Sequence, residues 1–269
     1  MNPKLMIITA LLILSAISST VCFADDPEAR RIMQQVEDRD DGDNQVTDMI
    51  MLLIDKNNKQ REKHFHNFSK DFGKDTKRIM FVTAPAQVAN TGFLTFDWDD
   101  ESKDDDQWLF LPAVGKTKRI ASSDKSSSFM GSDLNYSDMN SRNLADYDFT
   151  LLQESSIKGH PCWIIKSVPR SKEIMEETGY KQSIIAVRKD NFMVVRGKMW
   201  TYEGDYIKYM DVKELKQIDD IWVATQTHIV KKRGNNTVHQ TILSLSNVKF
   251  NQNLDDSVFT IRRIEKGLM

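Results

Sequence analysis

The chain has 269 residues, of which 40% are hydrophobic and 28% are charged, and its formal net charge at pH 7 is −2. That balance excludes the basic excess typical of nucleic-acid-binding proteins, so we expect no nucleic acid among its partners. The length is sufficient for one large β domain or two small ones, each with a hydrophobic core.

The first 24 residues have the pattern of a secretory signal peptide. Lys4 precedes an uncharged apolar stretch over residues 5–17, and small residues follow up to Ala24. This order predicts export and cleavage after Ala24. A retained membrane anchor is the alternative, but the apolar stretch is short for a span of about 20 residues. Export removes Cys22 and leaves Cys162 as the only cysteine, so we expect no intramolecular disulfide.

An amphipathic helix is predicted directly after the signal, within residues 25–43. Asp26 is a candidate N-cap, and Pro27 occupies the first helical position, where its missing N–H is not needed. Apolar residues then recur at the spacing of one helical face: Ala29, Ile32, Met33 and Val36. The breaker at residues 40–42, Asp-Asp-Gly, ends the predicted helix after about three turns.

From residue 47 the sequence changes to strand-length runs separated by turn residues. The runs lie at 47–54, 60–70, 77–84, 91–98, 107–112, 148–155, 161–168, 182–188, 192–201, 205–218, 221–233 and 237–250. Many connections are two or three residues long, so runs adjacent in sequence are expected to pair as antiparallel neighbours. We predict a single domain over residues 25–269, mainly β, with one antiparallel sheet of about 11 strands.

Two segments interrupt the strand pattern. Residues 137–146 begin with polar capping residues, and residues 169–179 have Ser171 as a candidate cap and Gly179 as a stop, so each is predicted to form a short helix. A sheet this wide twists until it curls. The open side of a partly curled sheet exposes apolar side chains, so we expect these segments and the N-terminal helix to cover it.

Residues suited to catalysis or metal binding are few. His64 and His66 point to the same face of one predicted strand, which suits a metal ion, but no third ligand lies at the required spacing. The acidic run 99–106 lacks the glycine and the final glutamate of a calcium loop, and a solvated hairpin tip is the simpler interpretation. The sequence contains no Gly-x-Ser-x-Gly elbow, phosphate-binding loop or dinucleotide fingerprint. We therefore predict no enzyme, no cofactor and no metal site.

Flexible apolar side chains are abundant: the chain has 13 methionines, 13 phenylalanines and five tryptophans. Many of the methionines lie in or beside predicted strands, where β-branched residues are usually preferred. Methionine adapts to irregular volumes and to variable apolar ligands. Composition alone leaves two interpretations open, a loosely packed core and a surface for an apolar ligand.

One stretch adds a resemblance to a known family. Residues 106–139, DQWLFLPAVGKTKRIASSDKSSSFMGSDLNYSDM, resemble the signature of the outer-membrane lipoprotein-sorting protein family, relatives of the LolA and LolB lipoprotein carriers. In that family an Asp-Gln-Trp strand ends in Leu-Pro, a basic run with Ile follows, and a Ser-Phe-Met-Gly-Ser-Asp segment leads to an acidic residue. The matching residues, in this order, are Trp108, Leu111-Pro112, Lys118-Arg119-Ile120, Ser128 to Asp133, Tyr136 and Asp138. The rest of the chain resembles the family more weakly but in the same order.

The resemblance implies a strongly curved, incomplete antiparallel β-barrel whose open face is covered by helices and which encloses an apolar cavity. It also implies a periplasmic carrier that binds acyl chains of lipoproteins or other lipids and moves them between the inner and outer membrane. An inner-membrane transporter of the RND type and transient contact with a membrane are its implied partners. A periplasmic sensor that detects lipid and reports to a membrane signalling partner is the alternative, and an enzyme acting on a lipid is a third hypothesis.

On this interpretation the same stretch carries the binding site. The predicted cover of the cavity is the segment around Gly131, which is its hinge, in a turn with positive φ. The cover consists of Phe129, Met130 and Leu134, with Asp133 and Tyr136 anchoring its far end. The preceding strand is predicted to line or brace the cavity wall with Trp108, Phe110 and Leu111.

Overall fold

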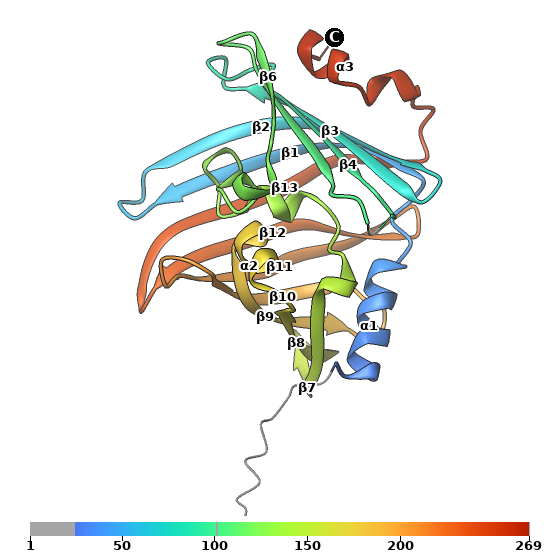
Figure 1. Cartoon of the computed structure of the whole chain (residues 1–269), viewed down its shortest axis with the longest axis vertical. Coiled ribbons are helices and arrows are strands. Elements are labelled where there is room, and N and C mark those ends of the chain that lie inside the picture. The colour runs from blue at the N-terminus through green and yellow to red at the C-terminus, as the bar shows by residue number, and fades with distance from the viewer. Residues whose placement is uncertain (1–24, 101, 269) are drawn as a thin grey trace, which may run out of the picture.

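Residues 25–100 and 102–268 are described by the structure, a computed structural model. They form one antiparallel sheet of 13 strands that curls without closing (Figure 1). The strands are β1 (Asn44–Asp55), β2 (Gln60–Phe72), β3 (Asp75–Ala84), β4 (Gly92–Asp97), β5 (Asp106–Leu111), β6 (Lys116–Arg119), β7 (Tyr147–Ile157), β8 (His160–Pro169), β9 (Tyr180–Arg188), β10 (Val194–Thr201), β11 (Ile207–Ile218), β12 (Ile221–Arg233) and β13 (Asn236–Phe250). The predicted fold class is confirmed, with 13 strands where the sequence predicted about 11. The predicted signal peptide, residues 1–24, lies outside the described residues.

The order of the strands determines how the sheet is covered. The order is β6-β5-β4-β3-β2-β1-β13-β12-β11-β10-β9-β8-β7, so all neighbours except β1 and β13 are also consecutive in sequence. The two edge strands, β6 and β7, are consecutive as well, and residues 120–146 connect them. We name this connection the strap. Because it joins opposite edges of a curled sheet, the strap crosses the inner face (green in Figure 1).

The strap contains four short 3-10 turns and no α-helix. They are η1 (Ser122–Asp124), η2 (Phe129–Gly131), η3 (Tyr136–Met139) and η4 (Leu144–Asp146). The single helix predicted for residues 137–146 is wrong, because Asn140 is extended, with a ψ of 163°, and separates η3 from η4. Asn, Ser and Asp are frequent here, and their side chains bond to nearby backbone groups in competition with a continuous helix.

The predicted N-terminal helix is confirmed as α1 (Pro27–Glu37). Asp26 caps it by accepting hydrogen bonds from the N–H groups of Glu28, at 2.9 Å, and Ala29, at 3.4 Å. Its apolar side buries Ala29, Ile32 and Met33 against β7, β8 and β9 and against the end of the strap. Removing this apolar surface from water stabilises the attachment of α1 to the sheet.

Two more helices complete the fold. α2 (Lys172–Thr178), between β8 and β9, has the predicted cap Ser171 and the predicted stop Gly179, whose φ is 78°. α3 (Ile261–Lys266), which was not predicted, packs on the outer face of β4, β5 and β6 (Figure 1). A Cβ atom at Gly92 would lie 2.8 Å from Cβ of Ile264, so this close approach requires glycine. In the described part of the chain, no helix is long and apolar enough to cross a membrane.

Candidate functional site

The inner face of the sheet is apolar near β1 to β4, and the strap packs on it. The buried residues of this cluster are Met49, Met51, Leu53, Phe65, Val82, Phe93, Ile120 and Phe129. Phe129, from the strap, has no exposed surface, and its ring centroid lies 5.0 Å from that of Phe93 and 5.5 Å from that of Tyr136. The half-buried strap residues on the same cluster are Met130, Leu134, Tyr136 and Met139. The strap therefore fills much of the apolar groove with its own side chains.

A buried carboxylate ties the middle of the strap to β13. Asp133 is 3% exposed and accepts hydrogen bonds from Nδ1 of His239 and Oγ1 of Thr241, both at 2.8 Å. The backbone N–H of Asp133 lies 2.9 Å from the same Thr241 hydroxyl. Since the strap is not a strand of the sheet, side-chain bonds of this kind determine where it lies.

A second polar network ties the strap to the other half of the sheet. Lys208, on β11, is buried and donates hydrogen bonds to Oδ1 of Asn135, at 2.8 Å, and to the Tyr180 hydroxyl, at 2.9 Å. That hydroxyl donates to the Asp138 carboxylate at 2.7 Å. Burial lowers the pKa of Lys208 to about 8, although the nearby charge of Asp138 acts in the opposite direction. The strap is thus anchored on both halves of the curled sheet.

The tip of the strap is a tight turn. Met130 and Gly131 both have positive φ, 48° and 79° respectively. A Cβ atom at Gly131 would meet nothing within 4 Å, so glycine is favoured there by its backbone conformation and not by lack of space. Lys63, on β2, donates to the carbonyl oxygen of Met130 at 2.6 Å and holds the turn against the sheet. The role of Gly131 as a hinge stays a prediction.

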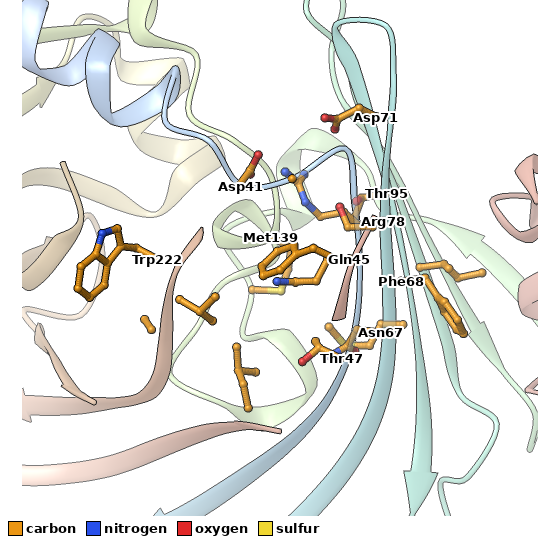
Figure 2. A pocket seen from close by; sticks show the side chains of 18 of the residues that line it. Asp41, Gln45, Thr47, Asn67, Phe68, Asp71, Arg78, Thr95, Met139 and Trp222 are labelled. Carbon is orange, nitrogen blue, oxygen red and sulfur yellow. The ribbon is translucent and has the colours of Figure 1, made fainter. Parts of the chain in front are cut away.

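A cavity of about 380 Å³ lies between the strap residue Met139 and the inner face of the sheet (Figure 2). Its apolar lining includes Met80, Phe93, Met139, Met193, Trp222, Val223, Ala224, Leu245 and Phe250. Register brings the lining residues of β1 to β4 side by side: Thr47, Asn67, Met80 and Phe93 face one another in turn across the strands. The volume is within the range of about 300–1,000 Å³ that is usual for small-molecule pockets.

Two polar atoms in the lining of this cavity have no hydrogen-bond partner among the described residues. They are Oγ1 of Thr95, a residue that is 1% exposed, and Oδ1 of Asn67. Buried polar groups are nearly always hydrogen-bonded, and ligand pockets combine an apolar lining with a few polar groups that orient the ligand. These two atoms are therefore suited to hold a polar group of a bound molecule.

A larger, polar cleft of about 990 Å³ adjoins the cavity. The two share Asp41, Asp71 and Arg78 in their linings, and Figure 2 shows these residues at the end of the cavity away from Thr47 and Asn67. The cleft is bounded by α1, the strap, α2 and the ends of β3 to β5. An apolar chamber and a polar chamber thus share part of their lining.

The ionisation of Asp105, in the cleft, lowers the free energy of unfolding in a pH-dependent way. Burial, with the neighbouring charge of Asp97, raises the pKa of Asp105 to about 6. A carboxyl group whose pKa is higher in the folded state destabilises that state above about pH 6 and has no such effect below about pH 4, where it is protonated in both states. We therefore expect Asp105→Asn to increase the free energy of unfolding by about 1 to 2 kcal/mol at pH 7 and to change it little at pH 4.

Urea unfolding of wild type and Asp105→Asn at pH 4 and pH 7 measures this difference. Asparagine retains an oxygen for the backbone N–H of Trp98, which donates to Asp105 at 3.0 Å. The same change in unfolding free energy at both pH values would contradict the argument, because it would not depend on ionisation.

The predicted wall residues lie elsewhere. Trp108 and Phe110 are on the outer face of β5, in the cluster under the C-terminal segment, and Leu111 is 41% exposed. Successive side chains of a strand point to opposite faces, so Gln107 and Leu109 are the β5 residues on the inner face. Of the two predicted roles, lining or bracing the cavity wall, the position of Trp108 and Phe110 therefore fits only bracing, whereas the strap residues Phe129, Met130, Leu134 and Tyr136 lie on the inner face.

Sequence reasoning missed the residues that do line the cavity. Phe93 and Thr95 carry no motif, and Met139 is only the last residue of the stretch 106–139 and was assigned no role. The alternation of side chains within each predicted strand shows which residues share a face, and it groups Phe93 with Thr95. The pairing of that strand with its neighbours, which brings residues of different strands together in the cavity lining, cannot be read from one segment of the sequence.

The two histidines of β2 have single carboxylate partners. Nδ1 of His66 lies 2.6 Å from Asp48, and His64 pairs with Glu62. Within residues 25–100 and 102–268, no group of three His, Cys, Asp or Glu side chains is placed to hold a metal ion. Cys162 is a free, buried thiol.

A strap-crossed, unclosed antiparallel half-barrel with an internal apolar cavity has the architecture of the LolA-like proteins. A LolA superfamily protein from Nitrosomonas europaea matches it with a TM-score of 0.65 and 18% identity, over 87% of this chain and 98% of that one. At that identity the likeness concerns the fold alone.

Two solved structures are similar in sequence as well as fold. A DUF1329 family protein from Desulfovibrio piger has 26% identity and a TM-score of 0.81, over 90% of this chain and 99% of that one. A domain from Vibrio parahaemolyticus named for outer membrane lipoprotein sorting has 25% identity and a TM-score of 0.79, over 88% of this chain and 98% of that one. A family model with the description "Uncharacterized protein" matches residues 74–266, and no curated protein sequence matches the chain. The chain belongs to the family whose model matches residues 74–266, and the resemblance to outer-membrane lipoprotein-sorting proteins that the stretch 106–139 predicted is confirmed by these solved structures.

Proposed function

We propose that this protein is a periplasmic carrier that binds the acyl chains of lipoproteins or other lipids and moves them between the inner and outer membrane. The observation that carries the proposal is the apolar cavity on the inner face of the sheet, beside a strap that presents apolar side chains to the same face. The relative named for outer membrane lipoprotein sorting supports a lipid-binding carrier as the general class. The role proposed is binding and release, without catalysis.

Binding and release follow from competition between the cargo and the strap. Each CH₂ group removed from water contributes about 0.8 kcal/mol, so a long acyl chain gains on the order of 10 kcal/mol. A chain longer than the cavity takes the place of Phe129, Met130 and Leu134 on the groove, and the strap moves aside. Breaking the contacts between the strap and the sheet costs part of the free energy that burial of the acyl chain provides. The affinity for the cargo therefore stays low enough for a membrane acceptor to remove it.

The partner in this proposal is an inner-membrane transporter of the RND type, reached after export by the predicted signal peptide. The family resemblance supports it. Crosslinking in living cells, followed by identification of the captured proteins, tests the partner. We expect capture of such a transporter. Capture of an anti-sigma factor in its place would favour the alternative, a lipid sensor.

Cargo binding is tested on the purified protein. We expect mass spectrometry of an organic extract to find acyl lipid, and the delipidated protein to bind a fluorescent fatty acid. Met80→Trp, which places a larger ring in the cavity, is expected to weaken that binding at least about tenfold, the equivalent of two lost CH₂ contacts. Leu152→Trp, at a β7 position that is 46% exposed, is the matched control and should bind as wild type does. An empty extract together with no fatty-acid binding would refute the carrier proposal.

A further inference from the structure

A row of inner-face residues leads from the cavity into the cleft. Across β1 to β5, the residues that face one another in the strand register are Gln45, Ser69, Arg78, Thr95 and Gln107. The first four line the cavity, and Arg78 and Gln107 line the cleft. A molecule that lies along this row has one end among the apolar side chains of the cavity and the other end in the cleft.

The row presents unsatisfied hydrogen-bond acceptors. Gln107 is completely buried, and its Nε2 donates to the Tyr136 carbonyl of the strap at 2.9 Å, but its Oε1 has no partner in the described part of the chain. Oγ1 of Thr95, in the same row, and Oδ1 of Asn67, in the neighbouring row of the cavity lining, also lack a partner among the described residues. An amide oxygen only accepts hydrogen bonds. The group that satisfies Gln107, in the lining of the cleft, must therefore be a hydrogen-bond donor.

Negative charge dominates the cleft. Eleven acidic and five basic side chains line it. Three of the bases already have carboxylate partners within the lining: Arg78 with Asp97, Lys74 with Asp99, and Lys125 with Glu177. Burial raises the pKa of both Asp71 and Asp105, which means that their charged forms lack compensation. A cation in the cleft relieves that cost, whereas a phosphate or a carboxylate adds to it.

We infer that the cargo of this protein is an acylated molecule whose polar part carries positive charge and hydrogen-bond donors. Its acyl chain lies in the cavity and its polar part lies in the acidic cleft. The inference rests on the proposed carrier function and adds the chemical class of the polar part. Ammonium groups meet both requirements, since they are cationic and purely donating. A lysine-containing lipidated peptide and an amino lipid both offer that group, and the experiment separates them.

The first arm compares dodecylamine with dodecanoic acid, which have chains of the same length and opposite charge, as competitors of a bound fluorescent fatty acid. The wild-type protein is expected to bind the amine at least about tenfold more tightly than the acid. In the double variant Asp71→Asn, Asp105→Asn the preference is expected to fall to about twofold or less. Asparagine retains an acceptor for Thr76 Oγ1 and for the Trp98 N–H, each at 3.0 Å, so the local structure is kept. The double variant Asp219→Asn, Asp220→Asn, in the turn between β11 and β12, changes the net charge by the same amount outside the cleft and should leave the preference unchanged.

The outcomes separate this inference from the proposed function. Equal affinity for the two ligands, tighter binding of the acid, or a preference that survives in the double variant overturns the inference while acyl binding stands. If neither ligand nor the fluorescent fatty acid binds, the carrier function itself fails. The second arm compares a palmitoylated peptide containing lysine, its glutamate counterpart, and sphinganine. Preference for the lysine peptide supports a lipoprotein source, tightest binding of sphinganine supports an amino-lipid source, and no discrimination overturns the inference.

Discussion

Phe129→Ala is expected to lower the free energy of unfolding by about 3 to 5 kcal/mol. Phe129 is fully buried between the strap and the inner face of the sheet, and its ring contacts those of Phe93 and Tyr136. The strap cannot collapse into the resulting space, because Lys63 and Asp133 hold the tip and the middle of the strap to β2 and β13. Urea unfolding followed by tryptophan fluorescence measures the loss.

The same variant separates the strap's two roles. With less apolar strap surface to displace, Phe129→Ala is expected to bind a fluorescent fatty acid more tightly than wild type, although it is less stable. Val114→Ala, in the exposed turn between β5 and β6, is the control and should change stability by less than about 0.5 kcal/mol. A stability loss below about 1 kcal/mol for Phe129→Ala would contradict a packed strap.

Asp133→Ala is expected to lower the free energy of unfolding by about 3 kcal/mol, because it leaves His239 and Thr241 without their carboxylate partner. Thr241 is completely buried, so water cannot replace the lost bond without opening the structure. Backbone amides of the strap should exchange with deuterium faster, while those of β1 and β13 should change less. Urea unfolding and residue-resolved hydrogen exchange provide the two readouts.

Asp133→Asn provides the matched control for the hydrogen bonds of Asp133 to His239 and Thr241. Asparagine keeps an oxygen that accepts from one of the two partners, so its loss of stability should be about half as large or less. If the exchange rates of the strap amides in Asp133→Ala stay at wild-type values, the Lys208 network alone positions the strap. The hydrogen bonds of Asp133 would then have no independent role.

Both predictions concern a segment that competes with the proposed cargo for one surface. The strap contributes apolar side chains to the centre of the groove and polar bonds at its margins. Its displacement therefore exchanges one set of apolar contacts for another, and the polar bonds determine the remaining cost. Changes at the margins should alter cargo affinity without altering the cavity lining.

Local sequence determined much of the fold. The N-cap Asp26, Pro27 and the apolar spacing that follows them act within one helix, so the start of α1 at Pro27 was predictable, although the helix ends at Glu37, before the predicted breaker at residues 40–42. Short turns predicted antiparallel pairing of consecutive strands, and the stretch 106–139 predicted the resemblance to lipoprotein-sorting proteins. By contrast, α3 was missed, because its six residues are too few for a helical periodicity and it is held by packing on β4 and β5.

The candidate site depended on information that no single segment contains. Alternation places Trp108 and Leu109 on opposite faces of β5, but only the contact of Leu109 with the strap cluster, and of Trp108 with the C-terminal segment, determines which face is inside. Likewise, the row from Gln45 to Gln107 exists only once five strands have paired in register. The sequence by itself thus determined the class of sheet, the helix α1 and the resemblance to lipoprotein-sorting proteins. The tertiary structure decided which face is covered, where the cavity lies and what lines it, because side-chain facing and strand register are set by contacts between residues far apart in the chain.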